Sequence, residues 1–312
     1  MGRLIEAFLD KVPYVRDLRR QVEKQGGFPA GHYYSPIPDQ DEVLAYFESR
    51  KSQTDLVDIR LNKESQFRLL DEYAQFYKDL PFPEKQQPDC RYYYDNDWFS
   101  YGDAIFLYSF LRRHEPKRII EIGSGFSSAV MLDTVDRFFA HRPEITLVEP
   151  YPDRLLSLLR SDDEGQIRII DKKIQQVPSE LFSSLESGDL VFIDSSHVVK
   201  CGNDMQLLMF DILPFLPSGI FVHFHDVLYP FEYPSAWLKQ GRYWNESYFL
   251  RAFLSFNCEW NIYFFSSYVA LLFSDFLKDK MPLCVKSPGS SLYIQREKKG
   301  NGIQAAAVGP RS

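Results

Sequence analysis

A glycine-rich turn between an apolar run and a polar helix start is the first place in this sequence that could do chemistry. Gly123-Ser124-Gly125 follows the apolar run 118–122, and a helix is expected to begin at about Ser127. Glycines let the backbone approach a ligand closely, and the first turn of a helix offers N–H groups that have no partner inside the helix. A dinucleotide dehydrogenase uses this geometry to hold a pyrophosphate, with a third small residue, here Ser128, packing helix on strand.

Two carboxylates at the ends of neighbouring strands favour a different ligand. Glu121 lies two residues before Gly123, and an anion beside a pyrophosphate is unfavourable. Beside a cationic or zwitterionic ligand such as S-adenosylmethionine, the same charge is favourable. Glu149 ends the next expected strand, where a carboxylate can accept hydrogen bonds from both hydroxyls of a ribose. The pair therefore favours a ligand that contains adenosine and carries a positive charge.

A further group of candidates lies at the ends of the next two expected strands. Asp194 ends the run 189–194, His197 lies three residues further, and His225-Asp226 lies near the end of the run 219–227. In a doubly wound sheet these strand ends face the same crevice as the glycine turn. A histidine there can remove a proton from a hydroxyl group. The alternative is that His197 merely begins the helix after its strand.

Short β-rich runs that alternate with helical segments must position these residues. Strands are expected at 118–122, 145–149, 167–170, 189–194 and 219–227, and later at 261–265 and 290–296. Helix-compatible segments separate the first five runs, which indicates a parallel sheet covered on both faces. We therefore predict an α/β fold with a doubly wound, mostly parallel, seven-stranded sheet in a domain of residues 100–296.

The segments on either side of this domain have different patterns. Residues 1–99 show no strand alternation and are expected to form a helical N-terminal cap, with helices within 1–27, 42–49 and 64–78. The stretch 297–312 is polar and rich in small residues, so we expect it to be a disordered tail.

Composition and charge exclude several classes of protein. The chain of 312 residues has a net charge of −7, which argues against a general nucleic-acid-binding surface. Its four cysteines form no CxxC pair, so neither a zinc knuckle nor a disulfide framework is indicated. The N-terminus has no secretory apolar core, and no stretch of about 18 apolar residues is free of charge. We expect a cytoplasmic protein without a transmembrane segment or a nucleic-acid partner.

Four segments carry a resemblance to a known family. They are EIGSGFSS at 121–128, VEP at 148–150, FIDSSH at 192–197 and PSGIFVHFHD at 217–226. Together they resemble the class I S-adenosylmethionine-dependent methyltransferases. More narrowly, they are similar to the branch of macrolide-sugar and rhamnosyl O-methyltransferases and cephalosporin-hydroxylase-like proteins. The resemblance covers about residues 100–296 and implies a Rossmann-like methyltransferase fold.

The resemblance implies a role for each matching residue. The glycine turn would bind the methionine part of S-adenosylmethionine, Glu149 its ribose and Asp171 its adenine. The full set of cofactor candidates is Glu121, Gly123, Ser124, Gly125, Phe126, Ser127, Ser128, Glu149, Asp171 and Asp194. His197 would be the base, and the catalytic candidates besides it are His225 and Asp226. Asp194 and Asp226 would bind a divalent metal or hold the substrate. Metal-dependent relatives carry two adjacent acids where this chain has His225-Asp226, and histidine suits zinc or iron better than magnesium.

The sequence thus predicts methyl transfer from S-adenosylmethionine to a hydroxyl group of a small molecule, with a sugar or glycoside as the expected acceptor. Two alternatives on the same scaffold stay open: a metal-dependent hydroxylase, and a catalytically inactive domain that binds cofactor as an assembly partner. An NAD-dependent oxidoreductase is disfavoured by Glu121 and by the lack of a nearby Tyr-x-x-x-Lys pair. Assembly into a homo-oligomer is compatible with the sequence.

Overall fold

Two compact units make up the part of the chain that the computed structural model describes, which is residues 12–24, 28–49 and 55–297. One unit is formed by residues up to 52 together with 233–243, and the other by 53–232 and 244 onward. The first part of the helix expected within 1–27 lies outside the described residues. So does the tail expected at 297–312, apart from Glu297.

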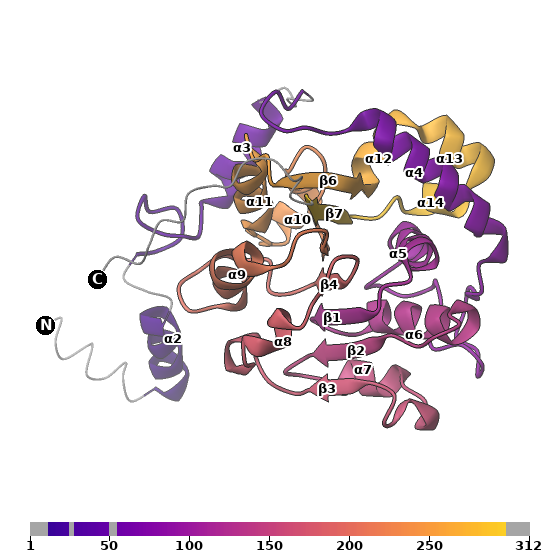
Figure 1. The fold of residues 1–312 in the computed structure, drawn as a ribbon. Coiled ribbons are helices and arrows are strands. Elements are labelled where there is room, and N and C mark those ends of the chain that lie inside the picture. The colour runs from indigo at the N-terminus through magenta and orange to yellow at the C-terminus, as the bar shows by residue number, and fades with distance from the viewer. Residues whose placement is uncertain (1–11, 25–27, 50–54, 298–312) are drawn as a thin grey trace, which may run out of the picture. The chain divides into compact units, whose positions relative to one another are not determined.

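The larger unit contains a seven-stranded sheet with the order β3-β2-β1-β4-β5-β7-β6, which runs from bottom to top in Figure 1. The strands are β1 (Arg118–Ile122), β2 (Glu144–Val148), β3 (Arg168–Ile170), β4 (Leu190–Ile193), β5 (Phe221–Phe224), β6 (Trp260–Phe265) and β7 (Leu292–Arg296). The first five strands pair in parallel, whereas β7 pairs antiparallel with both β5 and β6. The predicted α/β fold with its mostly parallel sheet is confirmed.

Helices cover both faces of this sheet. Ile119 of β1 belongs to a core with α5 (Tyr101–His114), α6 (Phe126–Phe138) and α7 (Asp153–Leu158). The next residue, Ile120, belongs to a second core on the opposite face. The helices of that second core include α8 (Glu180–Ser183), α9 (Asp204–Leu207) and α11 (Glu246–Leu254). Because both faces are covered, the central strands are continuous hydrophobic runs.

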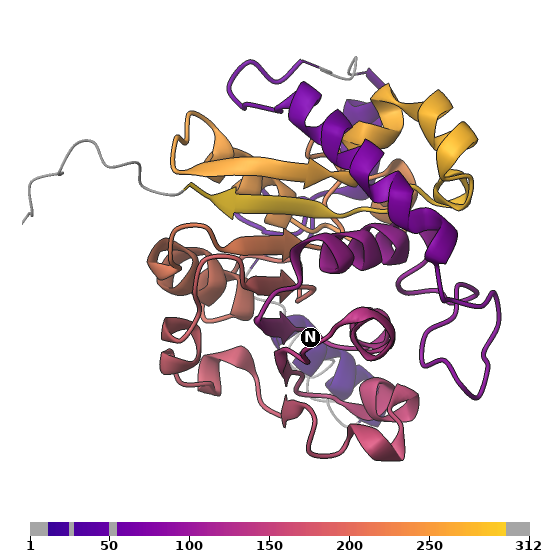
Figure 2. The same ribbon diagram turned by 45° about the vertical axis from the view of Figure 1, so that its right-hand side comes forward.

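Residues 55–99 belong to the same unit as the sheet, so the chain does not divide at the boundary expected at residue 100. Here α4 (Lys63–Phe76) runs beside α12 (Ser266–Leu272) and α13 (Ser274–Lys280), as Figure 2 shows, while α14 (Leu283–Lys286) packs on α5.

Two side chains, one from the residue before α4 and one from within α4, hydrogen-bond to the backbone of the edge strand β6. Asn62 donates a hydrogen bond to the carbonyl oxygen of Ile262 (3.2 Å), and Gln66 Oε1 accepts one from the N–H of Phe265 (2.7 Å). Edge strands lack backbone partners on one side, and these amides supply them. This need explains why α4 belongs with the sheet rather than with a separate cap.

The smaller unit contains α2 (Pro13–Lys24), α3 (Gln40–Ser49) and α10 (Ser235–Lys239). Asp39 begins α3 by accepting the N–H groups of Asp41 (2.9 Å) and Glu42 (3.0 Å) through Oδ1. Gln40 donates from Nε2 to the carbonyl oxygen of Lys239 (2.9 Å), which ties α3 to α10 although 199 positions separate these residues.

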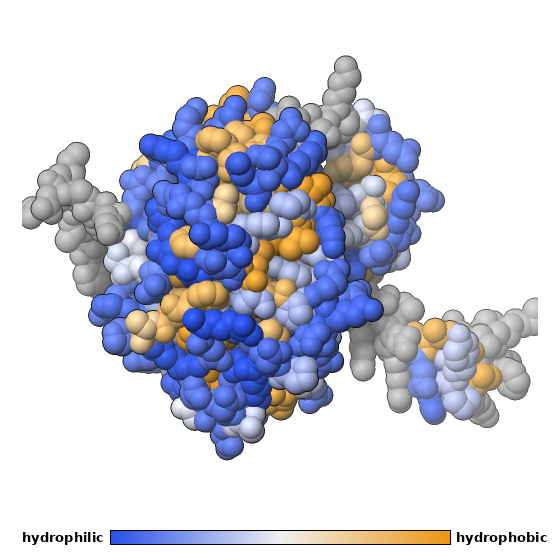
Figure 3. Space-filling view, turned by 90° about the vertical axis from the view of Figure 1, so that its right-hand side faces the viewer, coloured by the Kyte–Doolittle hydropathy of each residue, from blue (hydrophilic) through white to orange (hydrophobic). Residues whose placement is uncertain are grey.

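The surface of the larger unit is polar on the face that Figure 3 shows, where smaller hydrophobic areas are interspersed among hydrophilic side chains. Apolar residues at the surface of a folded protein are ordinary. None of the helices described in either unit has the length and apolar content that crossing a membrane requires.

A buried arginine fixes the segment that precedes α5. Arg91 is 3% exposed, and its guanidinium contacts the carboxylates of Asp133 (2.8 Å), Asp136 (2.7 Å) and Asp163 (2.8 Å from Nε). Asp133 also accepts the backbone N–H groups of Arg91 and Tyr92, both at 2.9 Å. One cation and three acids thus tie the segment before α5 to α6 and to the turn after α7.

We expect Arg91→Met to lower the free energy of unfolding by about 3 to 5 kcal/mol, because it leaves buried carboxylates without their cation. Urea denaturation followed by circular dichroism measures this change. Lys278→Met is the matched control, since Lys278 pairs with Asp275 where both side chains are exposed, and it should leave stability almost unchanged. Equal, small changes in both variants would contradict the role given to Arg91.

Candidate functional site

The glycine turn after β1 lies directly against the end of β4. Gly123 has a φ of 81°, in the left-handed region, and its N–H donates to the carbonyl oxygen of Val148 (3.0 Å). A Cβ atom at Gly123 would lie 1.7 Å from the carbonyl oxygen of Asp194. Both the backbone conformation and the space therefore require glycine at this position.

Three of the expected cofactor residues hold this turn from behind. Glu121 is fully buried and accepts hydrogen bonds from the hydroxyl groups of Ser127 (2.6 Å) and Ser128. Burial raises the pKa of Glu121 to about 8. Ser128 Oγ in turn accepts the N–H of Gly125 (3.1 Å). Glu121, Ser127 and Ser128 thus fix the start of α6.

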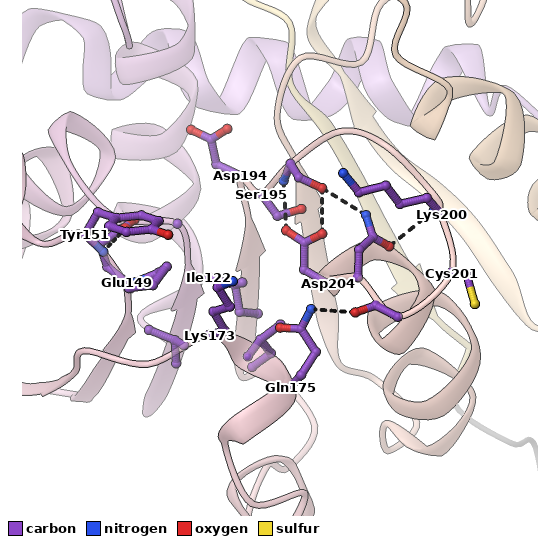
Figure 4. A pocket seen from close by; sticks show the side chains of 17 residues that line it. Ile122, Glu149, Tyr151, Lys173, Gln175, Asp194, Ser195, Lys200, Cys201 and Asp204 are labelled. Carbon is purple, nitrogen blue, oxygen red and sulfur yellow. Dashed lines mark hydrogen bonds between the residues drawn. The ribbon is translucent and has the colours of Figure 1, made fainter. Parts of the chain in front are cut away.

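A cavity of about 660 Å³ opens beside the turn, at the carboxyl ends of β1, β2 and β4 (Figure 4). Glu149 follows β2 directly, and its carboxylate accepts the N–H groups of Ser124 (3.0 Å) and Tyr151 (2.8 Å). The volume is within the range of small-molecule sites. The lining residues are Ile122, Gly123, Val148, Glu149, Pro150, Tyr151, Lys173, Ile174, Gln175, Asp194, Ser195, Ser196, Lys200, Cys201, Gly202, Asn203 and Asp204.

The expected cofactor residues differ in how they relate to this cavity. Gly123, Glu149 and Asp194 line it. Ser124 and Gly125 belong to the turn itself, whereas Glu121, Phe126, Ser127 and Ser128 are buried behind it. Asp171 is exposed just after β3 and is not among the lining residues. The structure therefore brings part of the predicted set to one wall.

The cavity also contains polar residues that the sequence did not indicate. Lys173 and Gln175 come from the loop after β3, and Lys200 comes from the loop after β4. Gln175 donates from Nε2 to the carbonyl oxygen of Gly202 (3.2 Å), which links the two loops. These residues lie in the segments that follow strands whose carboxyl ends face the glycine turn, and that position is the signal that could have found them.

Beside the cavity, four predicted catalytic and metal-binding residues lie close together. Asp194 Oδ1 is 3.4 Å from His197 Nε2 and 3.4 Å from His225 Nδ1. Asp226 lies 3.8 Å from His197 Nε2 through Oδ2, and 3.7 Å from His225 Nδ1 through Oδ1. The strand ends therefore converge as the fold class predicted, and Asp194 belongs both to the cavity and to this cluster.

Three residues that are distant in the sequence complete the His–Asp cluster. Glu246 Oε2, from α11, is 2.8 Å from His197 Nδ1. Asp103 Oδ2, from α5, is 3.7 Å from His225 Nε2. Ser290, before β7, donates a hydrogen bond to Asp226 Oδ1 (2.8 Å). No local motif surrounds Glu246, Asp103 or Ser290, so their role follows only from the fold.

Charge pairing sets the protonation of this cluster. Burial alone would lower the pKa of His197, but hydrogen bonds with Asp194 and Glu246 outweigh it and raise the pKa to about 10. Burial also opposes charge on His225, yet the nearby Asp226 and Asp194 raise its pKa well above the ordinary value. Although burial would raise the pKa of Asp194, the two imidazole rings hold it well below its usual range. At neutral pH, His197 is therefore an imidazolium held by carboxylates.

The cluster does not fit a resident divalent metal. The carboxylates of Asp194 and Asp226 face imidazole nitrogens of His197 and His225 within 4 Å, and these rings supply the balancing positive charge. In the part of the chain that the structure describes, no group of three His, Cys, Asp or Glu side chains is arranged to hold a metal ion. We therefore assign no role to a metal.

Residues 120–227 match a protein-family model that is described as a methyltransferase domain. An uncharacterized protein of Archaeoglobus fulgidus is 35% identical over an alignment of 175 residues, which covers 53% of this chain and 77% of that protein. The matched domain runs from β1 to the residue after Asp226, so it spans the glycine turn, the cavity and the strand-end members of the His–Asp cluster.

Two methyltransferases are among the solved structures that the chain matches. The S-adenosylhomocysteine-bound methyltransferase PaMTH1 of Podospora anserina is 16% identical, with a TM-score of 0.40 and coverage of 88% of this chain and 99% of that one. The O-methyltransferase TomG of Streptomyces achromogenes, involved in tomaymycin synthesis, is 14% identical, with a TM-score of 0.35 and coverage of 84% and 100%. At these scores, neither structure bears on what this chain binds.

The raised pKa of His197 makes stability depend on pH in a defined direction. A histidine whose pKa rises on folding, here from 6.5 to about 10, stabilises the folded state fully below its unfolded pKa, and this contribution is lost as the pH rises through about 10. We expect the free energy of unfolding to fall more steeply between about pH 7 and 9 in the wild-type protein than in His197→Gln. The difference in slope is at most about 1.4 kcal/mol per pH unit.

Urea titrations at several pH values measure these slopes. His141→Gln is the control, because His141 is exposed and lies outside the His–Asp cluster, and it should keep the wild-type slope. Equal slopes in His197→Gln and in the wild-type protein would show that His197 does not gain a proton on folding.

Proposed function

The chain belongs to the class I S-adenosylmethionine-dependent methyltransferases, and on that premise we propose that it methylates a hydroxyl oxygen of a small molecule, with sugars and glycosides as the acceptor class. The observation that carries the proposal is the continuity between the cavity and the His–Asp cluster through Asp194. A ligand in the cavity and a hydroxyl group at the cluster would meet at this residue.

The cavity has the features that S-adenosylmethionine needs. Glu149 is held by two backbone N–H groups with its carboxylate at the cavity wall, where it would accept the hydrogen bonds of a ribose diol. Gly123 lines the cavity as well, so its backbone is available to a ligand there. The carboxylate of Asp194 lies at the cavity wall next to the turn, where it can accept a hydrogen bond from the ammonium group of the cofactor. When bound, the cofactor supplies an electrophilic methyl group.

The His–Asp cluster would handle the proton of the acceptor. His197 Nε2 points between Asp194 and Asp226, so a hydroxyl group hydrogen-bonded to Asp226 would lie within reach of this nitrogen. Because the ring is protonated at neutral pH, His197 accepts the acceptor's proton only after releasing its own. The carboxylates of Asp194 and Asp226 would also align the hydroxyl group with the methyl group. Correct positioning alone can lower a reaction barrier by several kcal/mol.

An aromatic residue near the cluster supports a sugar or a ring-shaped glycoside as the acceptor. The half-buried ring of Trp244 lies 4.3 Å from that of His197, measured between ring centroids. Apolar ring faces combined with a few placed polar groups are typical of sites that bind polar small molecules.

Cofactor binding tests the cavity assignment. We expect Glu149→Gln to weaken the binding of S-adenosylmethionine by roughly ten- to a hundredfold, since hydrogen bonds to a charged group contribute about 1.5 to 3 kcal/mol. Isothermal titration calorimetry measures the affinity. Glu144→Gln is the matched control, because Glu144 lies at the amino-terminal end of β2 and the cavity lies at the carboxyl end. Unchanged affinity in a folded Glu149→Gln protein would show that the cofactor binds elsewhere.

Methyl transfer tests the reaction itself. We expect the wild-type protein, given S-adenosylmethionine and a panel of simple glycosides, to release S-adenosylhomocysteine and to add one methyl group to an oxygen of an acceptor. His197→Gln should lower turnover by about 10² to 10⁴-fold with little change in cofactor affinity. Wild-type turnover should rise with pH from neutrality toward about 10, as His197 loses its proton.

Mass spectrometry and nuclear magnetic resonance of the product identify the methylated atom. Transfer to nitrogen or carbon would overturn the proposed O-methylation. Cofactor binding without transfer to any acceptor would instead favour an inactive assembly partner. A pH profile that is flat between neutrality and about pH 10 would remove His197 from the role of base.

A further inference from the structure

We propose that Glu246 is a positioning residue, which keeps a proton on His197 Nδ1 and thereby presents His197 Nε2 to the acceptor. The proposal deepens the proposed function, because it assigns a partner to the residue that would handle the proton. Glu246 lies 49 positions after His197, and its Oε2 is 2.8 Å from Nδ1. Both side chains are buried, with 1% of Glu246 and 7% of His197 exposed.

The two ring nitrogens of His197 face different partners. Nδ1 has Glu246 at hydrogen-bonding distance, whereas Nε2 lies 3.4 Å from Asp194 and 3.8 Å from Asp226, on the side of the cavity. The hydrogen bond that one nitrogen makes decides which nitrogen keeps the proton when the ring becomes neutral. Because the bond to Glu246 is the shortest, the ring should lose its proton from Nε2. Without Glu246, Asp194 would be the closest acceptor and the proton would stay on Nε2.

The backbone around Glu246 holds His197 as well. The carbonyl oxygen of His197 accepts the N–H groups of both Asn245 and Glu246, each at 3.2 Å. Asn245 also binds the backbone of Val199 twice, accepting its N–H (2.6 Å) and donating to its carbonyl oxygen (3.2 Å). The Trp244 ring lies 4.3 Å from the His197 ring. Residues 244–246 thus fix the position of the loop after β4.

These contacts stabilise an unusual backbone conformation at His197. His197 has a φ of 58°, in the left-handed region, which a residue with a Cβ rarely adopts without support from its surroundings. Such strain at one residue, together with a buried carboxylate aimed at its ring, is the arrangement expected where side-chain direction matters for function. A salt bridge that served stability alone would not require this backbone conformation.

The test is nuclear magnetic resonance of the full chain labelled with ¹⁵N-histidine, without any acceptor. Loss of one set of ring signals in His197→Gln assigns the ring of His197. At a pH high enough to make the ring neutral, we expect the wild-type ring to keep its proton on Nδ1, where Glu246 accepts it. In Glu246→Gln, the neutral ring should carry its proton on Nε2, where Asp194 is the nearest carboxylate. Glu246→Asp, which retains the charge, should keep the wild-type tautomer.

Matched controls separate positioning from folding. Glu259→Gln removes an exposed carboxylate that pairs with Arg296 at the end of β7, and it should leave the His197 signals unchanged. A Glu246→Gln protein that unfolds at a lower temperature but keeps the wild-type tautomer would overturn the proposal. If Glu246→Gln does not fold, a neutral wild-type ring that carries its proton on Nε2 would overturn the proposal instead.

The resonance experiment and the transfer assay fail in different ways. If the wild-type protein transfers no methyl group, the proposed function is wrong, while the tautomer of His197 still tests Glu246. If transfer occurs, Glu246→Gln should lower kcat at least about tenfold and leave the KM for S-adenosylmethionine near the wild-type value, since Glu246 does not line the cavity. Equal kcat in the two proteins would overturn the positioning role.

Discussion

The close approach of Gly123 to the backbone of Asp194 is the constraint on which the site depends. No side chain fits between the turn after β1 and the end of β4, so these two pieces of backbone are in direct contact. That contact places the carboxylate of Asp194 at the wall of the cavity and, on its other side, between the rings of His197 and His225. The glycine therefore matters less for its own flexibility than for where it lets its neighbour lie.

Two carboxylates near this turn, the buried Glu121 and the partly exposed Asp194, are stabilised in different ways. Glu121 is surrounded by hydroxyl groups and has a raised pKa, so it is stabilised as a hydrogen-bonded group with little charge to balance. Asp194 faces two imidazole rings and stays ionised. The first arrangement is rigid and serves the helix start, whereas the second keeps charge available at a surface that a ligand can reach.

Sequence reasoning predicted those parts of the site that depend on strand ends. The glycine turn, Glu149, Asp194, His197 and His225-Asp226 all lie where parallel strands end, and a doubly wound sheet gathers such positions at one edge. Glu246, Asp103 and Ser290 reach the cluster from α11, α5 and the segment before β7, and their placement depends on tertiary packing that no spacing encodes. An exposed, ionised Glu121 would disfavour a pyrophosphate beside it. The sequence pattern does not reveal that Glu121 is buried. The place of residues 55–99 beside the sheet was likewise hidden, because the need of β6 for hydrogen-bond partners appears only once the strand order is known.

The amides that cover β6 also determine how copies of this protein can meet. Asn62 and Gln66 occupy backbone groups of β6 that an added strand would have to bind. At the opposite edge of the sheet, β3 is three residues long, too short to template a stable strand pair. Neither edge therefore invites the sheet-to-sheet pairing through which exposed strands aggregate or build continuous intermolecular sheets. Any contact between copies of this unit would therefore depend on the shape and charge of side-chain surfaces rather than on backbone pairing.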